Sequence, residues 1–130
     1  MKACFFDVDG TLLPKYHRQI PQETLEALVK LRENGHKVIL CTGRGVEELD
    51  FTDFRFDGYI LLDGQLCLDE NMEPYYENLI KGENLTELIR LFQKKQVPIV
   101  LTERQRVYMN FHNDYVRNVS EEISIAPHPV

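Results

Sequence analysis

The feature that most constrains this chain is a pair of aspartates at the end of an apolar run near the amino terminus. Asp7 and Asp9 flank one valine directly after the apolar residues 3–6, and Gly10 follows at once. The apolar run is continuous rather than alternating, which predicts a short, fully buried strand, Lys2–Phe6, in a parallel sheet covered on both faces. Two carboxylates at the end of such a strand are costly unless a cation compensates them, and hard oxygen ligands favour Mg²⁺ with a phosphate. The alternative is a plain turn, because Asp and Gly also favour turns.

The residues after this pair predict a strand–helix–strand unit. Pro21 suits the first turn of a helix, and Gly35 is a good stop at its carboxyl end. Lys37–Cys41 then predicts a second buried strand, which completes a right-handed βαβ unit. The apolar stripe of the helix comprises Leu25, Leu28, Val29 and Leu31.

The remaining residues predict a change of pattern near residue 80. Before it we expect a short helix over Val46–Leu49, a strand over Tyr59–Leu62, a turn at Asp63-Gly64, and a small hairpin of Gln65–Leu68 with Pro74–Glu77. The charged run Glu47–Asp50 is expected on a solvated face. After residue 80 we expect an amphipathic helix capped by Asn84 and Glu87, a hairpin of Val97–Thr102 with Val107–Phe111, a helix over Asn113–Glu121 and a last strand, Ile123–Ala126. The boundary is expected between residues 78 and 83, where Gly82 gives a flexible joint.

Composition excludes several classes of partner. The net charge of −6 divides into −7 in residues 1–80 and +1 in residues 81–130, and an acidic first part argues against nucleic acid. It leaves a small phosphorylated substrate open, because a bound metal supplies local positive charge. No apolar run approaches the ~20 residues of a membrane helix. Three cysteines, Cys4, Cys41 and Cys67, show no CxxC spacing, which predicts small core residues of a reduced, cytoplasmic protein.

Polar residues at the ends of the first two strands predict a ligand site. Ligands bind at the carboxyl ends of parallel strands, where Asp7 ends the first strand and Thr42 ends the second. If these strands are neighbours, both residues face one crevice, together with loop amides of Gly10, Gly43 and Arg44. Such a set can hold a phosphoryl group and a metal, and an aspartate there can act as a nucleophile through an aspartyl phosphate.

These motifs resemble a known enzyme family. Asp7-Val8-Asp9-Gly10-Thr11 together with Thr42-Gly43-Arg44 is similar to the haloacid dehalogenase (HAD) superfamily of phosphatases. The run Gly58–Gln65, followed by a helix and hairpin, resembles its Cof-type branch, which carries a large α/β cap of the C2 type. The resemblance implies an α/β fold with a three-layer Rossmannoid core and parallel sheet in residues 1–80. Part of an α+β cap domain would follow in residues 81–130.

The resemblance also implies roles for individual residues. Asp7 would attack phosphorus and bind Mg²⁺, while Asp9 would protonate the leaving alcohol, activate water and bind the metal through its main-chain carbonyl. Thr42 would donate a hydrogen bond to the phosphoryl oxygens, as would a backbone amide from Val8 or Gly43. Arg44 is equally consistent with substrate phosphate binding and with a structural ion pair that holds the loop. Asp63 departs from the Asn usual in this branch and would add negative charge near the phosphate.

The family pattern also includes two motifs that follow the cap. A lysine and an acidic pair follow the cap in the family, whereas this chain ends at Val130. We therefore expect the N-terminal part of a phosphatase, with weak Mg²⁺ binding and little or no turnover by itself. Its first strand would have a bare edge, which favours self-association or a partner.

The leading hypothesis is a Mg²⁺-dependent phosphatase, a phosphoric monoester hydrolase that acts on a small phosphorylated metabolite such as a sugar phosphate. Two alternatives stay open: a non-catalytic remnant that needs a partner chain, and a phosphomutase that uses the same two aspartates. An EF-hand, a dinucleotide fingerprint and a P-loop are all excluded by residue spacing.

Overall fold

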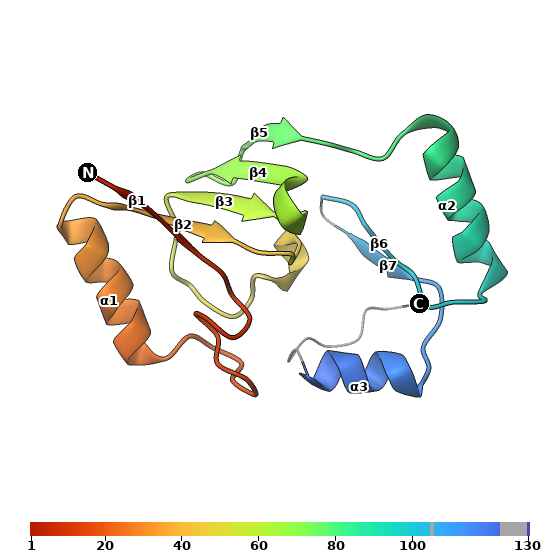
Figure 1. The fold of residues 1–130 in the computed structure, drawn as a ribbon, viewed down its shortest axis with the longest axis horizontal. Helices are drawn as coiled ribbons and strands as arrows, with labels where there is room; N and C mark the ends of the chain where they lie inside the picture. Colours follow the sequence, from red (N-terminus) through yellow and green to blue (C-terminus); the bar gives the residue numbers. More distant parts are fainter. Residues whose placement is uncertain (105, 123–129) are drawn as a thin grey trace. The chain divides into compact units, whose positions relative to one another are not determined.

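The computed structural model describes residues 1–104, 106–122 and 130, which form two compact units, Met1–Asn78 and Leu79–Val130 (Figure 1). In the first unit, five strands and one α-helix follow the predicted order. They are β1 (Ala3–Phe6), α1 (Gln22–Glu33), β2 (Lys37–Cys41), β3 (Gly58–Leu61), β4 (Leu66–Asp69) and β5 (Pro74–Glu77), with short 3-10 helices η1 (Val46–Glu48) and η2 (Leu62–Gly64). The strand–helix–strand unit and the β4–β5 hairpin are confirmed.

The five strands form one sheet in the order β1-β2-β3-β4-β5. The first three strands are parallel, so their carboxyl ends meet at one edge, and β4 and β5 are antiparallel. The predicted α/β class is confirmed, with a mixed sheet whose parallel part is β1–β3. The hairpin does not stand apart as a separate ribbon but extends this sheet on the β3 side (Figure 1).

Burial of β1 differs from the prediction of a strand covered on both faces. Phe5 is 58% exposed, whereas Val38 and Leu40 on the neighbouring strand are fully buried. Two features explain the difference: β1 is an edge strand that pairs only with β2, and the core packs on one face of these strands. The continuous apolar run was therefore misleading, because composition does not report which faces of a strand other elements cover.

Helix α1 supplies part of that core. Pro21 lies at its N-cap, and Leu28 is buried at the centre of the packed face. Val29, which we expected in the same stripe, is 43% exposed, because consecutive helical residues point about 100° apart. Gly35 ends the helix at a φ of +77°, a left-handed conformation that favours glycine.

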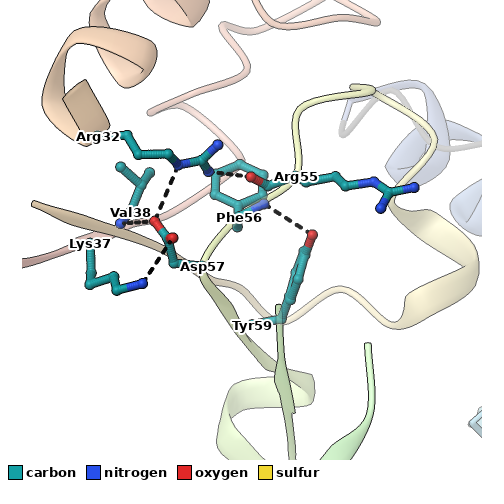
Figure 2. A network of polar contacts seen from close by, with 7 residues as sticks. All are labelled: Arg32, Lys37, Val38, Arg55, Phe56, Asp57 and Tyr59. Carbon is teal, nitrogen blue, oxygen red and sulfur yellow. Dashed lines mark hydrogen bonds and ion pairs between the residues drawn. The ribbon is translucent and has the colours of Figure 1, made fainter. Parts of the chain in front are cut away.

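A polar network at the opposite edge of the sheet ties α1, β2 and β3 together (Figure 2). The Asp57 carboxylate accepts the Val38 N–H at 2.8 Å, and it pairs with Arg32 at 3.4 Å and Lys37 at 3.3 Å. Burial raises the pKa of Asp57, but the Val38 hydrogen bond and the two cationic partners outweigh it and hold the pKa below 3.8. The network therefore anchors the chain where it enters β3.

The described residues of the second unit form two helices and a hairpin: α2 (Gly82–Lys94), β6 (Val100–Thr102), β7 (Val107–Met109) and α3 (Asp114–Glu122). The predicted amphipathic helix is confirmed, but its predicted cap is wrong. The helix begins at Gly82 after Lys81, no side chain caps it, and Asn84 lies inside it. Gly82 has a φ of +63°, which lets the chain enter the helix earlier than the capping pattern indicated. The predicted strand Ile123–Ala126 lies outside the described residues.

The hairpin pairs as predicted, but both strands are shorter because a buried asparagine takes over the pairing at one end. Asn110 is 1% exposed and accepts the Ile99 N–H at 2.9 Å. Its amide also donates to the Phe92 and Val97 carbonyls, at 3.1 and 2.9 Å. The bonds to Ile99 and Val97 satisfy main-chain groups next to the shortened strand, and the bond to Phe92 satisfies a carbonyl in the last turn of α2.

The apolar stripe of α2 stays partly open among the described residues of this unit. Leu85 and Ile89 are 39% and 41% exposed. Across the described ranges, no helix is long and apolar enough to cross a membrane.

Candidate active site

The two aspartates lie in a compact turn directly after β1. Gly10 N–H donates to the Leu13 carbonyl at 2.9 Å, and Leu13 N–H donates to the Val8 carbonyl at 2.8 Å. Val8 and Leu13 are buried, whereas Asp7 and Asp9 are exposed. Gly10 has a φ of +80°, so the turn requires a residue that adopts the left-handed region easily. The turn thus buries its apolar residues and leaves both carboxylates at the carboxyl edge of the sheet.

The second loop leaves the sheet beside the first. Phe6 of β1 is in register with Leu40 of β2, so the chain leaves both strands at the same edge. Thr42 N–H donates to the Ile60 carbonyl of β3 at 2.9 Å, which fixes the start of this loop. Thr42 is 6% exposed, and its Oγ1 accepts the Arg44 N–H at 3.1 Å, a bond that does not use the hydroxyl hydrogen.

An ion pair joins the two loops. Arg44 Nη2 lies 2.6 Å from Asp9 Oδ1, and Arg44 Nε lies 3.0 Å from Asp9 Oδ2, which is a bidentate fork. The arginine side chain is only 5% exposed, while that of the aspartate is 42% exposed. Of the two roles left open for Arg44 by the sequence, the ion pair is present in the structure, and its partner is an aspartate of the first motif.

Helix η1 and the segment after it hold the arginine from its other side. Arg44 Nη1 donates to the Glu48 carbonyl at 3.2 Å, and the guanidinium carbon lies 5.3 Å from the centre of the Phe51 ring. Glu48 Oε2 accepts the Gly45 N–H at 2.8 Å and Glu48 is half-buried, whereas Glu47 and Asp50 are exposed, as expected for a solvated face. A glutamate three residues after the N-cap is a helix-capping pattern, and at Gly45 and Glu48 this pattern would have predicted the hydrogen bond from the Gly45 N–H to the Glu48 carboxylate.

A third loop reaches the same edge through a sharp turn after β3. Leu62, Asp63 and Gly64 have φ values of +50°, +53° and +88°, three successive left-handed residues. Leu62 N–H donates to the Arg44 carbonyl at 3.2 Å, and Asp63 N–H donates to the Thr42 carbonyl at 3.3 Å. The turn predicted at Asp63-Gly64 is confirmed, but its contact with the second loop had no signal in the sequence.

This turn brings a third carboxylate against the glycine of the second loop. A Cβ atom on Gly43 would lie 3.2 Å from Asp63 Oδ1 and 3.4 Å from Asp63 Oδ2. Glycine is therefore favoured at position 43 for space. Negative charge at this point would oppose an anionic ligand bound by this loop.

The donor set limits which metal the site fits. In the described ranges, no three His, Cys, Asp or Glu side chains are grouped so as to hold an ion. Asp7 supplies a carboxylate and Asp9 a main-chain carbonyl, and both residues are exposed. Mg²⁺ is commonly bound by one or two carboxylates plus waters and a substrate phosphate. The chemistry of the donors therefore fits Mg²⁺ and does not fit a metal held by protein ligands alone.

An α/β unit with two aspartates after its edge strand and a Thr-Gly-Arg loop beside them matches a known family. The model of the haloacid dehalogenase-like hydrolases matches residues 4–128, and the chain belongs to that family.

Individual relatives agree with this assignment. The chain is 28% identical to YkrA of Bacillus subtilis (strain 168) over 106 residues, which cover 76% of this chain and 38% of YkrA. It is 39% identical to the HMP-PP phosphatase of Klebsiella pneumoniae (strain 342) over 62 residues, which cover 46% of this chain and 22% of that protein. The solved structure of the HAD subclass IIB sugar phosphatase BT4131 superposes with a TM-score of 0.76 at 30% identity, over 99% of this chain and 52% of that one. The chain thus spans about half the length of that structure and less than half of these curated relatives.

Proposed function

We propose that the whole protein is a Mg²⁺-dependent phosphatase that hydrolyses a phosphoric monoester through an aspartyl phosphate. One observation carries the proposal: Asp9 and Arg44 join the aspartate turn to the Thr-Gly-Arg loop at the carboxyl edge of the parallel strands. That contact brings a nucleophile candidate, an acid–base candidate and phosphate-binding donors to one place. Membership in a hydrolase family supports it.

The proposed chemistry has two steps. In the first, an oxygen of Asp7 attacks phosphorus, the bond from phosphorus to the leaving oxygen breaks, and Asp9 gives that oxygen a proton. In the second, Asp9 takes a proton from water, the water oxygen attacks phosphorus, and the bond to Asp7 breaks, which releases phosphate and restores the carboxylate. Each group returns to its starting state.

The remaining donors would orient the phosphoryl group. The Thr42 hydroxyl and the amide of Gly43 lie on the second loop at this edge and would donate to phosphoryl oxygens, whereas the Gly10 amide already donates to the Leu13 carbonyl. Mg²⁺ held by Asp7 and Asp9 would neutralise charge on the transferring group. Asp63 would oppose that charge, which makes the cation more important here than in a site without it.

We propose a sugar phosphate as the substrate class, with residues 81–130 as part of a cap domain that selects it. The support is similarity: BT4131 is a sugar phosphatase, and this chain covers half of it at 30% identity. The HMP-PP phosphatase is the competing guide, so the substrate panel should include a diphosphate.

The test measures phosphate release by the whole protein from hexose phosphates, from a diphosphate ester and from p-nitrophenyl phosphate. Asp7→Asn should lower kcat by at least about a thousandfold, because the amide cannot serve as the nucleophile. Removing divalent cations with a chelator should abolish turnover, and Mg²⁺ should restore it. The matched control is Glu70→Gln, which neutralises an exposed carboxylate in the β4–β5 turn and should keep full activity. Turnover by Asp7→Asn near the unsubstituted rate would reject the mechanism.

A further inference from the structure

We propose that Arg44 is a positioning residue that orients Asp9 for proton transfer, and that it does not bind the phosphate of the substrate. The inference rests on the proposed phosphatase function and assigns a role within the same site. It starts from the fork between the two side chains, in which both oxygens of Asp9 accept a hydrogen bond from Arg44.

A bidentate fork fixes more than distance. Two parallel N–H···O bonds set the plane of the carboxylate as well as its position, which a single-point lysine contact does not. Proton transfer needs the carboxyl oxygen within hydrogen-bond reach of the leaving oxygen, so a rotated carboxylate loses efficiency even when its charge is intact.

The surroundings of Arg44 hold it away from a ligand. Its main-chain N–H donates to Thr42 Oγ1, its Nη1 donates to the Glu48 carbonyl, and its guanidinium lies over the Phe51 ring. With its side chain 5% exposed, Arg44 would have to leave these contacts to reach a substrate phosphate.

The Asp9 side chain is more exposed than the Arg44 side chain, which indicates that Arg44 acts on a substrate through Asp9. Asp9 keeps 42% of its side-chain surface open to solvent, whereas the arginine side chain that supports it is 5% exposed. Arg44 thus acts on the reaction through Asp9.

This role makes a prediction that phosphate binding does not. A general acid matters most when the leaving oxygen is a strong base and least when it is a weak one. Loss of Arg44 should therefore slow phenyl phosphate far more than p-nitrophenyl phosphate, two esters of nearly the same shape. Loss of a phosphate ligand would slow both equally, because the phosphoryl group is the same.

The experiment compares kcat and KM for these two esters in the whole protein with Mg²⁺. Arg44→Met keeps much of the apolar stem and removes the fork, and we expect at least a tenfold greater loss of kcat with phenyl phosphate. Asp9→Asn should show the same bias, and the double variant should be no slower than Asp9→Asn alone, because both changes remove one function. Arg55→Met, which removes an exposed cation in the β2–β3 connection, is the matched control and should leave both esters unaffected (Figure 2).

A second readout is independent of turnover. Calorimetric titration with inorganic phosphate should give the same Kd, within about twofold, for the unsubstituted protein and for Arg44→Met. Arg44→Lys covers the case in which Arg44→Met fails to fold, because it keeps the charge and loses the fork, and it should show the same bias between esters. If Arg44→Met lowered kcat equally for both esters and weakened phosphate binding, the positioning role of Arg44 would be overturned, but the proposed phosphatase function would not. Absence of hydrolysis in the unsubstituted protein would overturn the proposed function and this inference with it.

Discussion

The carboxylate of Asp57 accepts the main-chain N–H of Val38 at 2.8 Å, across the amino ends of two neighbouring strands. The same carboxylate pairs with a cation on α1 and a cation on β2, so one side chain fastens three elements (Figure 2). The contact lies at the edge of the sheet opposite the aspartate turn. It therefore stabilises the fold that positions the site without touching the site.

Replacing this carboxylate should cost stability in a pH-dependent way. The pKa of Asp57 is held below 3.8 in the folded protein, so its contribution is present above that pH and is lost as the pH falls through the folded-state pKa. Asp57→Asn should lower the free energy of unfolding by about 1–2 kcal/mol at neutral pH, because hydrogen bonds to a charged group are lost. Urea unfolding from pH 7 to pH 2.5 measures the difference, which should shrink below about pH 3.8. Asp53→Asn, which changes an exposed neighbour, is the control, and a difference that does not vary with pH would contradict the assignment.

A methyl group on Gly43 should disturb the site through Asp63. The added Cβ would lie 3.2 Å from Asp63 Oδ1, which is tight enough to force a small shift of the carboxylate. Gly43→Ala should lower the free energy of unfolding by about 1 kcal/mol, in the range of mild overpacking. The check is a double-variant cycle with Asp63→Ala, in which the cost of Gly43→Ala should largely disappear. Strictly additive costs would show that the two residues do not interact.

Neutralising Asp63 should strengthen phosphate binding. The carboxylate lies beside the loop that is proposed to bind phosphate, so Asp63→Asn removes a repulsion and keeps a residue type that tolerates the left-handed conformation. We expect the Kd for inorganic phosphate to fall by about threefold to tenfold at low salt, and the gain to fade as salt screens the charge. Asp53→Asn serves as the control here as well. A Kd that stays the same at low salt would place the Asp63 charge outside the reach of the ligand.

The sequence predicted the parallel strands and the first helix well because their signals are local. Apolar runs and the Pro21 and Gly35 boundaries are properties of consecutive residues, and the elements began and ended close to where these signals indicated. Predictions that depended on the environment of an element were less accurate. The exposure of Phe5 depends on β1 being an edge strand with one covered face, and composition does not report that.

The candidate site shows the same division. The two motifs stand out in the sequence because each follows a predicted strand, and the structure adds the contact between Asp9 and Arg44 that joins their loops. The place of Asp63 beside Gly43 could not be predicted, because it depends on three successive left-handed residues of which only Gly64 has a clear preference. The contacts of Glu48 and Phe51 with Arg44 depend on tertiary packing in the same way.

Chemical trapping of a phosphorylated aspartate tests whether Asp7 is the nucleophile. The whole protein is mixed with p-nitrophenyl phosphate and Mg²⁺, quenched, and reduced with borohydride, which converts an aspartyl phosphate to a stable alcohol that peptide mass spectrometry locates. We expect reduction at position 7 in the unsubstituted protein and none in Asp7→Asn. Phosphate release without a reduced aspartate in the unsubstituted protein, or reduction at a different residue, would contradict it.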